Sequence, residues 1–156
     1  MLEPQKGRRL LALVRQIVDG ELDRDGKLLR ICELLHSEVA HYDWVGFYLV
    51  VPGSRELLLG PFVGAPTEHQ RIPFGRGICG QAAERKETFV VPDVSQQNNY
   101  LSCSPDVRSE IVVPVLRGGQ IVGELDIDSH SLSSFGPGDE ELLESICAQV
   151  AGLFPL

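Results

Sequence analysis

Three carboxylates at alternate positions are the clearest sign of chemistry in this sequence. Glu124, Asp126 and Asp128 lie in a strand-like run over residues 120–129, and the side chains of a strand point to opposite faces in turn. The three therefore share one face, where their like charges repel one another. On an open surface water would screen them, whereas in a concave site they would hold a cation, a metal ion or a proton.

A cysteine and a fourth carboxylate stand just upstream of this run. Cys103 lies in a polar loop over residues 94–108, and Glu110 follows at the start of the preceding strand-like run. A loop of this length in a compact domain is usually functional or mobile. The loop thiol beside the carboxylates is where we expect the functional site.

A second thiol, Cys79, falls in the first turn of a helix that opens with Gly75-Arg-Gly-Ile-Cys-Gly80. A glycine-rich helix start exposes backbone N–H groups that can bind a carboxylate or lower the pKa of a thiol. The same glycines resemble a phosphate loop, but neither the long buried strand nor the Gly-Lys-Ser/Thr ending is present, so nucleotide binding is disfavoured. Cys32 and Cys147 lie within apolar helical stripes, which predicts buried structural thiols.

The carboxylates are positioned by a predicted β-hairpin whose strands flank Gly118 and Gly119. With a plain two-residue loop Glu110 would pair with Ile127, on the face opposite Asp126 and Asp128. A bulge or a three-residue loop shifts the register by one residue and brings the acids together. The hairpin pattern alone allows either register.

The remaining pattern predicts an α+β fold, an antiparallel sheet of about five to six strands with helices packed mainly on one face. The whole chain, 1–156, is expected to be a single domain. Its expected parts are N-terminal helices over 8–40, the sheet and active-site loops over 44–130, and a C-terminal helix over 138–153. Within the first strand, Trp44 and Tyr48 share one face, which is either an aromatic pocket wall or a second packing layer.

Composition narrows the class of protein. The chain has 156 residues, 43% of them apolar, and a net charge of −8, which disfavours nucleic acid and anionic membranes as partners. No apolar run approaches the length needed to span a bilayer. The first residues lack the features of a signal peptide, because Arg15 interrupts the short apolar run. We therefore expect a cytoplasmic protein with reduced cysteines.

Several motifs, taken in order, resemble a GAF domain and, more narrowly, the free methionine-(R)-sulfoxide reductases. The resemblance runs from about residue 20 to about residue 150. It rests on Trp44-Val-Gly-Phe-Tyr48, Leu59-Gly-Pro-Phe62, Arg71-Ile-Pro73, Gly75-Arg-Gly-Ile-Cys-Gly80, Ser109-Glu-Ile-Val-Val-Pro114 and Gly123-Glu-Leu-Asp-Ile-Asp-Ser129.

The resemblance implies reduction of the free amino acid by a thiol, through a sulfenic acid and then a disulfide. It assigns the nucleophile to Cys103 and a possible resolving thiol to Cys79. The implied ligand set is Trp44, Tyr48, Glu110, Asp126 and Asp128. Because this set puts Glu110 with both aspartates, we predict the shifted hairpin register. It implies no cofactor and no metal, thioredoxin as the reductant, and a homodimer. Glu124 has no counterpart in this set, and we interpret it as a solvated or peripheral charge.

The sequence departs from the family at one place. A cysteine that normally forms the recycling disulfide stands just before the Arg-Ile-Pro strand, whereas this chain has His69 near that place. Recycling then needs Cys79 or an external thiol. An alternative is a stand-alone GAF module that binds a small ligand, as a sensor, with little turnover. A minor alternative is a metal site of Asp126, Asp128 and His130.

Overall fold

A computed structural model describes residues 2–97 and 105–155 of the chain. The helices are α1 (Pro4–Val18), α2 (Arg24–Glu38), α3 (Gly77–Arg85) and α4 (Pro137–Val150), with short 3-10 turns η1 (Val94–Gln96) and η2 (Ala151–Leu153). The strands are β1 (Trp44–Val50), β2 (Glu56–Val63), β3 (Arg71–Pro73), β4 (Phe89–Val91), β5 (Ser109–Arg117) and β6 (Gln120–Ser129).

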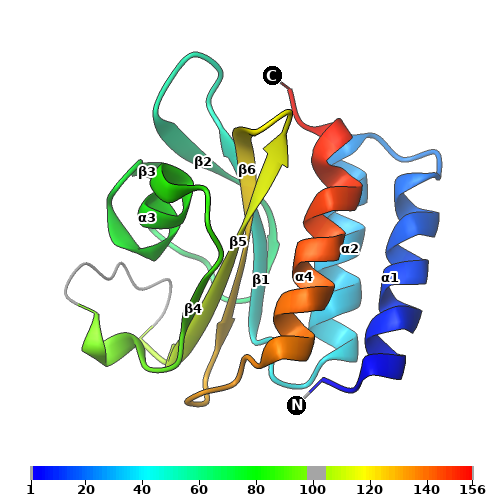
Figure 1. Cartoon of the computed structure of the whole chain (residues 1–156), viewed down its shortest axis with the longest axis horizontal. Helices are drawn as coiled ribbons and strands as arrows, with labels where there is room; N and C mark the ends of the chain where they lie inside the picture. Colours follow the sequence, from blue (N-terminus) through cyan, green and yellow to red (C-terminus); the bar gives the residue numbers. More distant parts are fainter. Residues whose placement is uncertain (1, 98–104, 156) are drawn as a thin grey trace.

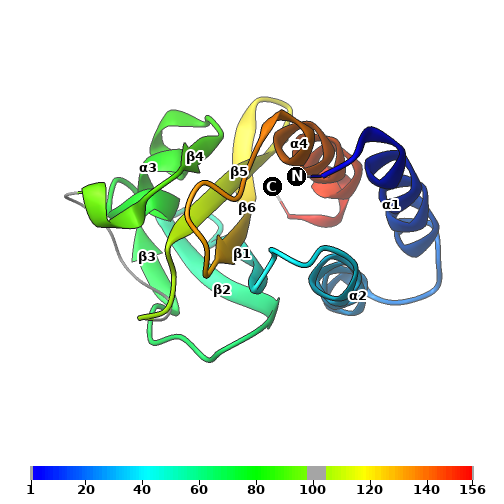
Figure 2. The same cartoon turned by 90° about the horizontal axis from the view of Figure 1, so that it is seen from below.

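The strands form one antiparallel sheet in the order β3-β2-β1-β6-β5-β4, which confirms the predicted α+β class. Helices α1, α2 and α4 lie together on one side of it, with α1 outermost (Figure 1). Helix α3 lies on the other side with the short edge strands β3 and β4 (Figures 1 and 2). The sheet is therefore covered on both faces.

Each face of the sheet has its own apolar cluster. Val45 and Phe47 of β1 belong to the larger cluster, against α1, α2 and α4. Trp44 and Tyr48 belong to a smaller cluster beneath α3. Because residues of β1 alternate between the two, almost the whole strand is buried.

The β5–β6 hairpin adopts the predicted shifted register. Gly118 and Gly119 both have positive φ angles, 59° and 79°, as a tight hairpin turn with two left-handed residues requires. A bulge between Val115 and Leu116 then moves the pairing by one residue. As a result Glu110 lies opposite Asp128, on the same face as Asp126.

The predicted helix ends shift by a few residues. Helix α1 begins at Pro4 rather than residue 8, because proline is favoured in the first turn although that turn carries no apolar stripe. Helix α4 runs from Pro137 to Val150 rather than over 138–153, and the Asp139 carboxylate in its first turn accepts the N–H of Gly136. None of the helices in the described ranges combines the length and apolar character that crossing a bilayer requires.

Candidate functional site

The start of α3 holds Cys79 against the sheet. Gly77 has a φ of 66°, which lets the chain turn sharply into the helix. A Cβ atom at Gly80 would lie 2.6 Å from the carbonyl oxygen of Pro73, so only glycine allows this close packing on β3. Cys79, between these glycines, is buried with 6% of its surface exposed.

A small cavity lies where α3, the sheet and the segment before β3 meet. Its volume is about 10 Å³, close to the space of a single water molecule. It is lined by Tyr48, His69, Ile72, Arg76, Gly77, Ile78, Cys79, Glu110 and Asp126. The cavity thus brings together four of the predicted site residues, which come from β1, α3, β5 and β6.

A thiol and two carboxyl groups converge at this cavity. The Cys79 Sγ atom, one carboxylate oxygen of Glu110 and one of Asp126 all lie within 4.8 Å of one another. Burial raises the pKa of Asp126, while hydrogen bonding with Glu110 and with Cys79 acts in the opposite direction. Since an ionised carboxylate only accepts hydrogen bonds, a bond between these two carboxyls requires a proton on one of them.

Glu124 was predicted to be a solvated or peripheral charge, and that prediction is wrong. Its exposed fraction is 0%, because α3 covers this face of β6. Burial first, and then the charge of Asp126, raise its pKa, whereas an interaction with the Cys79 thiol lowers it. Strand alternation had placed Glu124 with the other acids, and only the covering helix, which no local pattern reveals, makes it a buried one.

Asp128 and Trp44 belong to β6 and β1, two of the strands that contribute residues to the cavity. They are register partners across β6 and β1, and both are buried. The Trp44 indole stacks on Phe62 at a centroid distance of 5.4 Å and donates a hydrogen bond to the carbonyl of Ala65. Neither residue is among those lining the cavity. Their roles as ligand-binding groups stay a prediction.

The two aromatic residues on this face of β1 divide between the two predicted roles, a pocket wall and a second packing layer. Tyr48 is fully buried, lines the cavity and donates a hydrogen bond of 3.0 Å to the carbonyl of His69. That bond fixes His69 at the cavity, near the place where the sequence lacks the family's cysteine. Trp44 supplies packing beneath α3 instead.

The residues of the minor metal alternative do not converge among the described residues. Asp128 is buried, whereas the side chain of His130 is half exposed and lies 3.9 Å from the Asp43 carboxylate. The backbone N–H of His130 also donates to Asp43. His130 is thus held at the surface end of β6.

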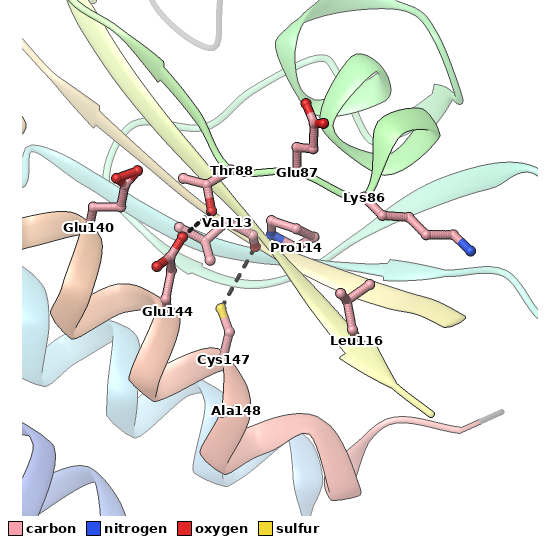
Figure 3. A pocket seen from close by; sticks show the side chains of 10 residues that line it. All are labelled: Lys86, Glu87, Thr88, Val113, Pro114, Leu116, Glu140, Glu144, Cys147 and Ala148. Carbon is pink, nitrogen blue, oxygen red and sulfur yellow. Dashed lines mark hydrogen bonds between the residues drawn. The ribbon is translucent and has the colours of Figure 1, made fainter. Parts of the chain in front are cut away.

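Cys32 and Cys147 are structural, as their helical stripes predict. Both are buried, and burial raises the pKa of each thiol far above its ordinary value. The Cys147 thiol donates to the carbonyl of Val113 at the floor of a hollow of about 590 Å³ between α4 and β5 (Figure 3). Although this hollow is larger than the cavity under α3, none of the predicted site residues that the structure describes lines it.

Cys103, the predicted nucleophile, lies outside the described residues, as do all of residues 98–104 of the loop predicted over 94–108. The described part of that loop contributes η1 before the gap and residues 105–108 after it. Its final residue, Arg108, pairs through its backbone with Val94 and Ser129, beside the start of β5. The loop thus returns to the sheet directly next to Glu110.

The chain is similar to known proteins along most of its length. The GAF domain family model matches residues 23–153. GAF domain-containing protein A of Dictyostelium discoideum is 39% identical over 151 residues, 93% of this chain and 94% of that protein. The free methionine-R-sulfoxide reductase of Saccharomyces cerevisiae is 37% identical over 135 residues, 78% of this chain and 74% of that protein.

A solved structure gives the same picture in three dimensions. The free methionine-R-sulfoxide reductase from Neisseria meningitidis, determined by X-ray crystallography in complex with its substrate, superposes with a TM-score of 0.92 at 37% identity. The match covers 99% of this chain and 91% of that one. The similarity therefore includes the sheet, α3 and the segments that line the cavity.

Proposed function

Because the chain belongs to the GAF domain family, and within it to the free methionine-R-sulfoxide reductases, we propose that it reduces free L-methionine-(R)-S-oxide to L-methionine. The observation that carries the proposal is the convergence of the Glu110 and Asp126 carboxyl groups on the Cys79 thiol, within 4.8 Å of one another, at one buried cavity. Sulfoxide reduction needs an acid and a thiol close together in a site that holds little water.

In the first step the Cys103 thiolate attacks the sulfoxide sulfur. The sulfoxide oxygen takes a proton from the Glu110–Asp126 pair and passes to Cys103, which leaves methionine and a sulfenic acid. Burial raises the pKa of the Asp126 carboxyl, which favours the protonated form that an acid needs. The ammonium group of the free amino acid would balance the negative charge of Glu110, Asp126 and Asp128, while Trp44 and Tyr48 pack beside it.

In the second step the Cys79 thiol attacks the sulfenic sulfur of Cys103. A disulfide forms and the hydroxyl leaves as water. Cys79 takes this role in the proposal because Cys32 and Cys147 are buried among apolar residues away from the cavity. His69 stands at the cavity where a further cysteine is absent.

Thioredoxin is the proposed reductant of the disulfide, since its dithiol returns two electrons by thiol–disulfide exchange. A compartment that keeps thiols reduced, the cytoplasm, suits this cycle. A homodimer remains part of the prediction and is checked by sedimentation velocity. None of these features requires a cofactor or a metal in the proposed reaction.

The test is a coupled assay with thioredoxin, thioredoxin reductase and NADPH. Free methionine-(R)-sulfoxide is expected to drive NADPH oxidation, whereas the S epimer and a peptide containing methionine-(R)-sulfoxide are not. Cys103→Ser should abolish turnover, and Cys32→Ser serves as the matched cysteine control. Full turnover by Cys103→Ser, or none by the wild type, contradicts the proposal.

A second candidate is favoured by one observation, the histidine at position 69. Without the family's usual recycling cysteine, the same cavity would serve a GAF module that binds a small amino acid and turns it over poorly. Calorimetric binding of methionine-(R)-sulfoxide, without methionine release in the coupled assay, would support this candidate over the reductase.

A further inference from the structure

The cavity under α3 carries a set of side chains with a second chemical use. The Cys79 Sγ atom and one carboxylate oxygen each of Glu110 and Asp126 lie within 4.8 Å of one another. Among residues 2–97 and 105–155, no other three histidine, cysteine or acidic side chains bring their ligand atoms this close together. A thiol and two carboxyl groups are donor types that a divalent transition metal ion binds.

Asp126 is a buried acid that points into this cavity. Its exposed fraction is 0%, and it is one of the residues that line the cavity. Neither of its carboxylate oxygens has a hydrogen-bond partner of regular geometry within the part of the chain that the structure describes. Buried charges in proteins are normally paired or coordinate a metal ion. A cation bound in the cavity would give the Asp126 oxygens such a partner.

The three ligand atoms come from three elements that the fold holds together. In the register of β5 and β6, Glu110 pairs with Asp128, the next residue on the same face of β6 as Asp126. Glu110 and Asp126 are therefore diagonal neighbours on one face of the hairpin. Cys79 faces them from the first turn of α3, which contacts both strands and lies over this side of the sheet (Figure 1). The fold itself thus brings the ligands together.

The size and donor set of the site favour Zn²⁺. The ligand atoms of a tetrahedral Zn²⁺ lie about 3.4–3.6 Å apart, so small side-chain rotations close the present spacing of at most 4.8 Å. Ca²⁺ needs about six to eight oxygen ligands and Mg²⁺ keeps several waters, whereas this cavity of about 10 Å³ is close to the space of one water molecule. Thiolates also bind Zn²⁺ in preference to these harder ions.

Binding exchanges protons for the ion. Zn²⁺ takes the thiolate form of Cys79 and the carboxylate forms of Glu110 and Asp126, and the protons that these groups held pass to the buffer. The ligands then carry one negative charge more than the ion neutralises. Arg76, a cationic residue that also lines the cavity, offsets this charge. No electron is transferred, so the step needs neither an oxidant nor a reductant.

We propose that the reduced cavity is a Zn²⁺ site formed by Cys79, Glu110 and Asp126, with the fourth coordination position left to water. An ion held there occupies the thiol and both acids, so it excludes a sulfoxide from the same groups. Zn²⁺ therefore keeps the protein inactive until a chelator withdraws the ion. This inhibition rests on the proposed reductase function, whereas the binding itself does not.

Co²⁺ is the probe of the site, because a thiolate bound to Co²⁺ gives a charge-transfer absorption band that the Zn²⁺ complex lacks. Reduced, metal-free wild-type protein is titrated with Co²⁺, and Zn²⁺ is then added to displace it. We expect one ion per chain and a thiolate band. Asp126→Asn should weaken Zn²⁺ binding about 100-fold or more, since loss of an outer-shell group alone costs about 10–100-fold. Asp25→Asn, the same change at an exposed position of α2, should match the wild type.

The thiol is tested by a matched pair of cysteine variants. Cys79→Ser should lose the thiolate band, whereas Cys32→Ser should keep it. Calorimetry of the wild type in buffers of different ionisation enthalpy should show that Zn²⁺ binding releases protons. A wild type that binds no stoichiometric ion overturns the inference, whether or not any variant folds. So does a thiolate band that survives in Cys79→Ser, or wild-type Zn²⁺ affinity in Asp126→Asn.

A single turnover without thioredoxin tests the inhibition. One equivalent of methionine-(R)-sulfoxide is added to the metal-free protein and to protein that holds one equivalent of Zn²⁺, and methionine is measured. We expect Zn²⁺ to suppress methionine release and EDTA to restore it. If the metal-free protein releases no methionine, the proposed function fails and the titration alone decides on the Zn²⁺ site. If methionine is released equally with bound Zn²⁺, the inference fails and the proposed function stands.

Discussion

A single buried acid and a cluster of buried acids lie on opposite sides of the same sheet, and they differ in the hydrogen-bond donors that surround them. Asp139, at the start of α4, is fully buried and accepts hydrogen bonds from the Tyr42 hydroxyl at 2.7 Å and the Gly136 N–H at 2.9 Å. His41 Nε2 lies 2.8 Å from the same carboxylate. Burial alone would raise the pKa of Asp139, but these hydrogen bonds outweigh it and lower the pKa.

The acids under α3 show the opposite balance. Burial raises the pKa of both Glu124 and Asp126, and the groups that lower it are a thiol and another acid. An arrangement that stabilised the fold would offer N–H and O–H donors, as Asp139 has. The contrast indicates two roles. Asp139 stabilises the packing of α4 against the chain before β1, whereas the acids under α3 serve the reaction and destabilise the fold.

The largest expected effect comes from Asp126→Asn. The amide keeps the shape but cannot deliver a proton, so kcat/KM for methionine-(R)-sulfoxide should fall by a factor of ~10²–10⁴. The free energy of unfolding should stay the same or rise, since the cost of burying this acid is removed. Coupled kinetics and urea unfolding on the same preparation check both. A variant that loses stability while keeping its activity would break the comparison.

Asp139→Asn should do the reverse. The charge-assisted hydrogen bonds from Tyr42 and His41 weaken, and we expect the free energy of unfolding to fall by about 2 kcal/mol. Reductase activity below the new melting temperature should be kept, because Asp139 lies among residues of the α4 side of the sheet. Loss of activity in a folded Asp139→Asn protein would show that the two regions are coupled.

Stability should depend on pH in two separate windows. Glu124 and Asp126 have raised pKa values in the folded state, so the folded protein binds more protons than the unfolded chain. Their contribution to stability is therefore full below about pH 4 and is lost as pH rises through the raised values. Asp139 has a lowered folded pKa, so its contribution is present above about pH 4 and is lost as pH falls through the folded value. Denaturant unfolding from pH 3 to pH 9 checks this. Glu124→Gln should flatten the decline above about pH 4, and a wild-type curve that rises there would contradict the assignment.

The smallest expected effect is the difference between two buried tyrosines. Tyr42 donates to a carboxylate, and Tyr42→Phe should destabilise the fold by about 2 kcal/mol. Tyr48 donates to the neutral carbonyl of His69, and Tyr48→Phe should destabilise it by about 1 kcal/mol. Melting curves of both variants give the ranking. Equal losses would mean that the charge of Asp139 adds little.

Local patterns were enough to predict most of the framework. The glycine pair and the alternating residues predicted the hairpin. Its shifted register, which the bulge provides, followed instead from the ligand set that the family resemblance implies. The burial of Cys32 and Cys147 followed from helical periodicity. These features depend on neighbours in the chain or on a single hairpin.

What the sequence did not reveal depends on segments far apart. A run of acids on a strand face is typical of a solvated surface, and only the packing of α3 turns Glu124 into a buried group. His41, which has no spaced partner in the sequence, lies against Asp139 from 98 residues away. Such pairs arise from the tertiary fold, so periodicity and motif spacing carry no sign of them.

A single turnover tests the central claim most directly. Reduced wild-type protein is mixed with one equivalent of free methionine-(R)-sulfoxide in the absence of thioredoxin, and methionine and disulfide-linked peptides are measured. The account predicts one methionine per chain and a disulfide that joins Cys79 to Cys103. Release of no methionine, or a disulfide that uses Cys32 or Cys147, would contradict it.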